Sequence, residues 1–339
     1  MLMLMLMLML ILMLILMRDL KKNHLKKKNS YTRALHRIWG NVTDTRMHIT
    51  GGLGAVHGIE GFGPSYLLPN ADAFNETCAA VGNVLFNFRM FLVHKDAKYL
   101  DVAEVSLLNN VLAAVNLEGN RFFYVNPLEA DGKYPFNHGT AGRAPWFGTA
   151  CCPSNMARLL PQVQGMTYAH DDKNLYLAMY AETSTKLDIA GTSLAISQKT
   201  DYPNEGRVEV SLNPEKPASF SLRLRIPTWT GKQFVPGKLY HYLKPSKPKW
   251  KISVNGKTVN PKTELGFVLL ERQWKKGDKV VLELPMPTLL NECDKRVEDN
   301  HNRVAFTRGP FVLCAEEVDN GGATQRFFLD KKPTVKKAD

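Results

Sequence analysis

Apolar residues recur at helical spacing in two stretches of the first half of the chain. In residues 71–94 the apolar positions are Val81, Val84, Leu85, Phe88, Phe91 and Leu92. In residues 98–115 they are Leu100, Ala103, Leu107, Leu108, Val111 and Leu112. Steps of three and four residues place such side chains on one side of a helix, against a core. We therefore predict a helical region from about residue 30 to 165.

Two long glycine-rich segments interrupt this helical region. They cover residues 48–66 and 126–150. Loops of this length inside a compact domain usually carry function, because few other roles justify their conformational entropy. We expect binding or catalytic groups in these two loops.

The apolar period changes from helical to two after about residue 168. Residues 207–212 (RVEVSL) and 219–226 (SFSLRLRI) alternate apolar with polar side chains. Residues 251–259 contain an Asn-Gly turn, and residues 274–286 repeat the order of turn and strand. Short alternating strands separated by Gly and Pro are typical of an antiparallel β-sandwich. Residues 303–317 (RVAFTRGPFVLCAEE) read as two further strands.

These patterns predict a multidomain α + β protein. We place an apolar and basic leader at residues 1–30, a helical domain at 31–167, a β-sandwich at 168–289, and the start of a further, incomplete β domain at 290–339.

The leader begins with 17 residues built almost only from Met and Leu, followed by a Lys-rich stretch. A secretory signal has its positive charge before the apolar run and a small-residue cleavage site after it, and neither is present. Seventeen residues is the short limit for a membrane span. A membrane anchor and a start site placed too early both remain open, so no cell compartment is predicted.

Charge changes the picture little. The net charge of +12 is concentrated in residues 18–37, residues 232–251 and the C-terminal KKPTVKK. Nucleic-acid sites usually interleave such charge with aromatic residues, which are sparse here. We predict a solvated basic surface and no nucleic-acid partner.

The five cysteines do not form the dense pattern of a disulfide framework. Two of them, Cys151 and Cys152, stand directly before Pro153. Proline favours the first helical position, so we predict a helix that begins at Pro153 with Cys152 as its cap. The positive end of that helix would favour thiolates. Two small buried apolar residues are the alternative.

Glu76 and Cys78 offer further ligand atoms. Inside a regular helix, positions two apart point about 200° away from each other, so they could share a ligand only if the helix begins at about Cys78. With Cys151 and Cys152 they would supply three thiolates and a carboxylate, a tetrahedral set suited to Zn²⁺. A solvated glutamate beside a core cysteine remains the alternative.

Residues 57–63 (HGIEGFG) carry His57 and Glu60 in the first glycine-rich loop. Glycines let backbone approach a ligand closely. A carboxyl group among Phe62, Tyr66 and other apolar side chains could serve as a general acid, and a solvated surface charge is the alternative. His57 is expected to donate or accept a hydrogen bond beside the site rather than to bind metal.

Five motifs, found in order between about residues 45 and 318, carry a family resemblance. They are ITGGLGAVHGIEGFGPSYLLPN, NETCAAVGN, FFYVNPLEADGKYPFN, PWFGTACCPSN and RIPTW. The chain resembles glycoside hydrolase family 127, the β-L-arabinofuranosidases. The resemblance implies the C-terminal part of an (α/α)6 barrel for the helical domain, followed by antiparallel β-sandwich domains.

The resemblance also implies roles for individual residues. Cys151 would be the nucleophile and Glu60 the acid/base of a retaining enzyme acting on arabinose-containing glycans. Glu76, Cys78, Cys151 and Cys152 would bind Zn²⁺. Glu104, Tyr124 and His57 would lie at the substrate. Family members carry several hundred residues ahead of the ITGG motif, so we expect a fragment that keeps the metal site and lacks part of the sugar pocket. A non-catalytic, zinc-stabilised carbohydrate-binding protein is the alternative, and the oligomeric state is not predicted.

Overall fold

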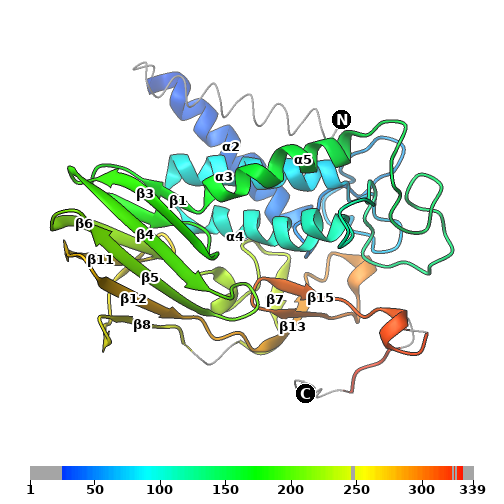
Figure 1. The fold of residues 1–339 in the computed structure, drawn as a ribbon. Coiled ribbons are helices and arrows are strands. Elements are labelled where there is room, and N and C mark those ends of the chain that lie inside the picture. The colour runs from blue at the N-terminus through cyan, green and yellow to red at the C-terminus, as the bar shows by residue number, and fades with distance from the viewer. Residues whose placement is uncertain (1–24, 246–248, 323, 325–326, 331–339) are drawn as a thin grey trace.

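The computed structural model describes residues 25–245, 249–322, 324 and 327–330. The Met/Leu segment, and with it the anchor alternative, lies outside these residues. Among the helices of the described part, none combines the length and the apolar character needed to cross a bilayer. Figure 1 shows the helices on one side of the β-sheets and the long loops gathered at one end of the helices. The structure is thus a mixture of helical and sheet layers, as predicted.

In the described part of the first half, the structure has four α-helices. They are α2 (Leu25–Thr45), α3 (Thr77–His94), α4 (Ala97–Ser106) and α5 (Cys151–Val163). Lys95 adopts a left-handed conformation and closes α3, and the Asp96 carboxylate accepts the Lys98 backbone N–H to cap α4. This two-residue connection folds α3 and α4 into a hairpin. Helix α4 continues through a π turn at Leu107–Val111 and a 3-10 turn at Leu112–Ala114.

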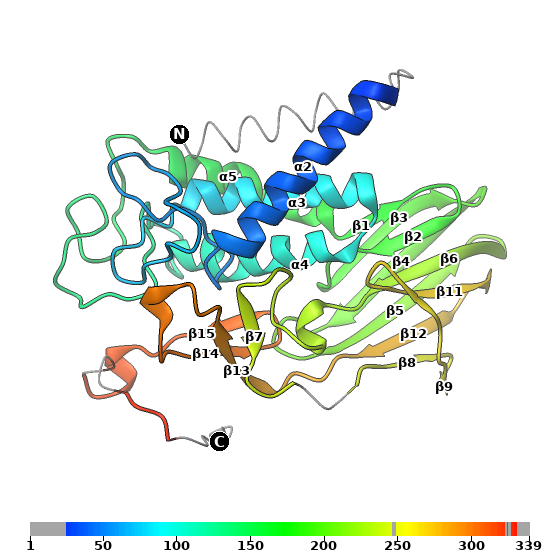
Figure 2. The same cartoon turned by 180° about the vertical axis from the view of Figure 1, so that it is seen from behind.

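The buried face of α3 differs from the predicted one. Val81, Val84 and Phe91 are buried as expected, whereas Leu85, Phe88 and Leu92 are only half-buried. The buried side also includes Asn83, Phe86, Asn87 and Met90. Helix α3 is covered on more than one side, because it contacts α4 and α5, and α2 crosses the α3–α4 pair (Figure 2). A single apolar stripe therefore describes it poorly. On the second stretch, Leu112 is exposed where the helix ends.

The second half is built from strands. They are β1 (Tyr168–His170), β2 (Asn174–Leu177), β3 (Thr183–Ile189), β4 (Thr192–Thr200), β5 (Arg207–Pro214), β6 (Ala218–Arg225), β7 (Tyr240–Tyr242), β8 (Lys251–Val254), β9 (Lys257–Thr258), β10 (Thr263–Glu264), β11 (Phe267–Trp274), β12 (Asp278–Glu283), β13 (Thr288–Cys293), β14 (Ala305–Arg308) and β15 (Phe311–Leu313). Their sheet orders are β1-β2-β6-β11-β10, β3-β4-β5-β12-β8-β9 and β15-β14-β13-β7.

The pairing confirms most of the predicted antiparallel arrangement. Along β5 the buried positions alternate with less buried ones, as period two requires. Asn255 and Gly256 both have positive φ, at 50° and 78°, which fits the tight turn between β8 and β9. One pair is an exception, because β2 and β6 run parallel. The third sheet takes β7 from within residues 168–289 and pairs it with β13.

A buried ion cluster joins the helical layer to the sheets. The Arg225 guanidinium on β6 is fully buried and donates to Asp101 Oδ1 at 2.6 Å and to both carboxylate oxygens of Glu104. The Tyr202 hydroxyl donates to Glu104 at 2.8 Å, and the Thr228 hydroxyl donates to Asp101 at 2.5 Å. Because Asp101 and Glu104 belong to α4, this cluster fixes that helix against the β6 strand.

Candidate metal centre and active site

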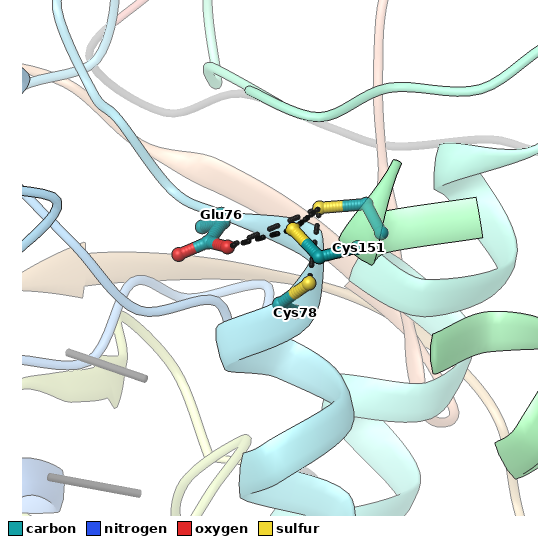
Figure 3. Close-up of side chains that lie close together, drawn as sticks. Glu76, Cys78 and Cys151 are labelled. Atoms are coloured by element: carbon teal, nitrogen blue, oxygen red, sulfur yellow. Dashed lines mark hydrogen bonds between the residues drawn. The ribbon is translucent and has the colours of Figure 1, made fainter. Parts of the chain in front are cut away.

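The four predicted ligand residues meet where two helices begin. Glu76 is the N-cap of α3, with an extended backbone (φ −66°, ψ 134°), and Cys78 is the second helical residue. Cys151 and Cys152 are the first two residues of α5. One ligand atom from each of the four lies within 4.8 Å of all the others. Figure 3 shows the Glu76, Cys78 and Cys151 side chains pointing toward one another.

This geometry answers the question that the spacing of Glu76 and Cys78 left open. Because Glu76 precedes the helix and Cys78 lies inside it, the two side chains escape the opposite orientations of a regular helix. The extended conformation of Glu76 is held by pairing with Val125, and the Thr77 N–H donates to the Tyr124 carbonyl at 3.0 Å. The start of α3 is therefore set by a loop almost 50 residues further along the chain.

The predicted start of α5 is wrong by two residues. The helix begins at Cys151 with Ala150 as its N-cap, and Pro153 is its third residue. Proline is tolerated there because N–H groups in the first helical turn have no intrahelical acceptor. Both cysteines consequently stand inside the first turn, at the positive end of the helix dipole.

The ligand atoms are close enough to share one metal ion, and the separation of the Cys151 and Cys152 sulfurs matches a tetrahedral site. The Cys78 and Cys152 sulfurs are 3.2 Å apart, and the Cys151 and Cys152 sulfurs are 3.9 Å apart. Glu76 Oε1 lies 3.9 Å from the Cys151 sulfur and 4.0 Å from the Cys152 sulfur. A disulfide needs about 2.05 Å, and all of these cysteines are free. Zinc–sulfur bonds of about 2.3 Å in a tetrahedron separate the sulfurs by about 3.8 Å.

A buried oxygen without a partner supports the same interpretation. Glu76 is 1% exposed, and its Oε2 has no hydrogen-bond partner among the described residues. Burial raises the pKa of Glu76 to about 7, and burial also raises the pKa of the Cys152 thiol. Groups that are costly to ionise in isolation are common where a cation is the missing partner. The residues present therefore fit a divalent metal ion.

Cys151 differs from the other ligand cysteines. It is half-buried, whereas Cys78 and Cys152 are buried. A hydrogen bond from Cys152 lowers the pKa of the Cys151 thiol to about 5, against the effect of burial, and a hydrogen bond from Tyr124 adds to the shift. Cys151 is thus a partly accessible sulfur that favours the thiolate at neutral pH, the form that acts as a nucleophile.

Tyr124 links the Cys151 sulfur to Glu60 in the first glycine-rich loop. Its single hydroxyl proton is shared between two acceptors, Glu60 Oε1 at 3.3 Å and the Cys151 sulfur. The Tyr124 ring packs against Phe74, His138 and Phe147, with ring centroids 6.2, 4.4 and 5.6 Å away. Glu60 itself is exposed, at a left-handed position with φ 46°, and it lies beside Tyr124 rather than among the apolar side chains expected from the sequence.

Two other predicted site residues have different surroundings. The His57 ring stacks edge-on against Phe74 at 5.3 Å, and its Nε2 lies 3.7 Å from Asp72 Oδ1, so it is placed beside the Tyr124 cluster and not among the metal ligands. Glu104 uses both oxygens to bind Arg225 and Tyr202 in the buried ion cluster. The structure therefore turns the Glu104 carboxylate to the sheet side of α4, and Glu104 is not one of the four clustered residues.

Buried asparagines that the sequence analysis missed support the site. Asn75, directly before Glu76, donates to the Asn126 carbonyl at 2.7 Å and accepts from Asn110 at 3.1 Å, which connects the second glycine-rich loop to the π turn after α4. Asn137 Oδ1 accepts the Tyr124 N–H at 2.8 Å. Gly52 lies against Asn75 and Asn110, where a Cβ would collide with both side chains. Polar residues within apolar helical stretches, such as Asn83 and Asn110, were the available signal.

Comparison with known protein families identifies three matching segments. Residues 18–165 match the β-L-arabinofuranosidase GH127 catalytic domain, residues 174–286 the GH127 middle domain, and residues 289–337 the glycoside hydrolase family 127 C-terminal domain.

Among curated proteins, a non-reducing end β-L-arabinofuranosidase of Bifidobacterium longum subsp. longum is 33% identical over 300 residues. That alignment covers 86% of this chain and 43% of the relative.

Two solved structures resemble the fold closely. A GH127 β-arabinofuranosidase has a TM-score of 0.82 and 41% identity, over 87% of this chain and 45% of its own. A GH127 β-L-arabinofuranosidase from Geobacillus stearothermophilus T6 has a TM-score of 0.80 and 34% identity, over 89% and 46%. The chain thus spans less than half the length of these relatives. The three matched segments, in the order found in this family and with its fold, show that the chain belongs to glycoside hydrolase family 127.

Proposed function

We propose that this protein is a retaining glycoside hydrolase that releases L-arabinofuranose from β-L-arabinofuranosides. The observation that carries the proposal is the arrangement of Cys151, a half-exposed thiol with a pKa lowered to about 5, joined through the Tyr124 hydroxyl to the Glu60 carboxylate. Retaining hydrolysis requires a nucleophile and a proton donor near each other, and Tyr124 contacts both candidates here. The names of the curated relative and of the two solved structures support the sugar assignment.

We propose that Glu76, Cys78, Cys151 and Cys152 hold a zinc ion. Three sulfurs and one oxygen within 4.8 Å of one another are a donor set that suits Zn²⁺. When bound, the ion would stabilise the thiolate form of its cysteines and compensate their charge. The first turns of α3 and α5 add their positive dipole ends to the same place.

Residues of the chain itself would then carry out the two steps of the reaction, formation and hydrolysis of the covalent intermediate. Glu60 donates a proton to the glycosidic oxygen while the Cys151 sulfur attacks the anomeric carbon, so a C–S bond forms as the C–O bond breaks. Glu60 next accepts a proton from a water molecule that attacks the same carbon and displaces the sulfur. Two inversions give net retention. Tyr124 and His57 are proposed to border the sugar. Glu104, also expected at the substrate, would have to act from its buried cluster.

We further propose that α2 to α5 form part of an (α/α)6 barrel. The α3–α4 hairpin, with α2 crossing it and α5 packed on α3, supports this assignment. In such a barrel the loops at one end of the helices carry the active site. Glu76 and Cys151 stand where α3 and α5 begin, and Figure 1 shows the long loops gathered at one end of the helices.

The proposal is tested by following an aryl β-L-arabinofuranoside with this protein by proton NMR. We expect release of the phenol and first appearance of the β anomer of arabinose, because two inversions restore the configuration. The matching aryl α-L-arabinofuranoside is the control and should remain intact. First appearance of the α product, or an intact β substrate, would contradict the proposal.

A further inference from the structure

Asn155 connects the candidate metal centre to a cation on the protein surface. It lies on α5, four residues after Cys151, and its Nδ2 is 3.2 Å from the Cys78 sulfur. Its Oδ1 accepts a hydrogen bond from Arg158 Nη1 at 2.9 Å. Arg158 is exposed and stands one turn further along the same helix. Asn155 therefore bridges an arginine of α5 and a ligand of α3.

Arg158 fixes the orientation of the Asn155 amide, and with it the donor and acceptor in the bonds to Arg158 and to Cys78. A guanidinium can only donate, so the amide atom that faces Arg158 must be the oxygen. The amide NH₂ group then faces Cys78, and the sulfur is the acceptor. A metal-bound thiolate has lone pairs for such a bond, which makes Cys78 a fitting partner in the metal-loaded state.

The negative charge of the four ligands explains why a hydrogen-bond donor beside Cys78 would stabilise the site. Three thiolates and one carboxylate carry four negative charges, against the two positive charges of a zinc ion. An uncompensated excess is costly in a site where three of the four residues are buried. The helix N-termini offset part of it. The amide of Asn155, polarised by the Arg158 cation, adds a donor on the Cys78 side of the site.

We propose that Asn155, backed by Arg158, is a positioning residue that holds the Cys78 sulfur at its ligand position and thereby sets the affinity of the site for metal. The inference rests on the metal centre proposed above. Hydrogen-bond partners of metal ligands commonly contribute 10- to 100-fold to affinity, because they fix the orientation of the ligand and offset its charge.

The test is a competition titration of Zn²⁺ between the protein and a chromophoric chelator. Asn155→Ala should weaken zinc binding by about 10- to 100-fold. Asn155→Asp keeps the size of the side chain but turns a carboxylate oxygen toward the sulfur, so it should weaken binding at least as much. Arg158→Met should lower the zinc affinity by no more than about fivefold, because Arg158 is exposed and water weakens its interaction with Asn155. Gln162→Ala, at an exposed position of α5, is the matched control and should leave the affinity unchanged.

A second measurement is independent of the titration. The sulfur-to-metal charge-transfer absorption of the Co²⁺-loaded protein should weaken or shift in Asn155→Ala and stay unchanged in Gln162→Ala. Thermal unfolding of the metal-free proteins shows whether each variant is folded. If Asn155→Ala does not fold, the zinc affinity of Asn155→Asp, whose side chain has the same size, decides the test. Zinc affinity within twofold of the wild type in a folded Asn155 variant would overturn the inference. A wild-type protein that takes up no zinc would overturn the proposed metal centre itself. This result is distinct from unchanged zinc affinity in an Asn155 variant, which would overturn only the role of Asn155.

Discussion

Replacing Cys151 with alanine will lower turnover of an aryl β-L-arabinofuranoside by at least about 1,000-fold, because loss of a covalent nucleophile leaves only the residual rate due to binding and acid catalysis. Glu60→Gln keeps the shape of the side chain but cannot donate a proton, and it should cost about 100- to 10,000-fold. Cys314→Ala is the matched control, because this exposed thiol lies outside the four-residue cluster. Turnover that survives Cys151→Ala would refute the assigned role.

The chemistry of Cys151 can be followed without turnover. Since its pKa is lowered to about 5 in the metal-free site, the thiolate fraction should rise as the pH rises from 4 to 6 and then level off. Alkylation by iodoacetamide, read by peptide mass spectrometry, should follow this curve at Cys151. Cys78 and Cys152 should react more slowly, because both are buried. A midpoint near the ordinary cysteine value of about 8.5, or an inert Cys151, would favour the non-catalytic alternative.

Replacing Arg225 with methionine will lower the free energy of unfolding by about 3–5 kcal/mol, because it leaves two buried carboxylates without their cation. Asp101 and Glu104 are 2% and 4% exposed, and burial raises the pKa of Asp101 even with Arg225 beside it. The loss should appear in urea unfolding followed by circular dichroism.

Arg207→Met provides the matched control on β5. Arg207 lies 3.6 Å from Glu283, and the two side chains are 56% and 54% exposed. Solvent-exposed pairs contribute at most about 1 kcal/mol, so this variant should lose about that much or less. Equal losses for the two variants would contradict the role given to the buried cluster.

Much of the sheet region was predictable because its signals are local. The alternation along residues 207–212 and the Asn255-Gly256 turn depend only on neighbouring residues. The parallel pairing of β2 with β6 was not predictable, since β2 has only four residues and a register set by a strand over 40 residues away.

The site was only partly predictable for a related reason. The residue types predicted a zinc site. Whether Glu76 and Cys78 could share an ion depended on where α3 begins, and the pairing of Glu76 with Val125 sets that start. The hydrogen bond between Glu104 and Arg225 could not be predicted, because the two residues lie 121 positions apart and no local pattern couples them. Asn155 was overlooked because a single asparagine next to two cysteines has no distinctive spacing.

Native mass spectrometry of the purified protein and of Cys152→Ser tests the central claim most directly. If Glu76, Cys78, Cys151 and Cys152 form one metal centre, the wild-type chain will carry one zinc ion, and the variant will lose it or bind it only weakly, because one of its four ligands is no longer a thiolate. A wild-type chain without zinc, or a variant with an unchanged zinc content, would contradict the account.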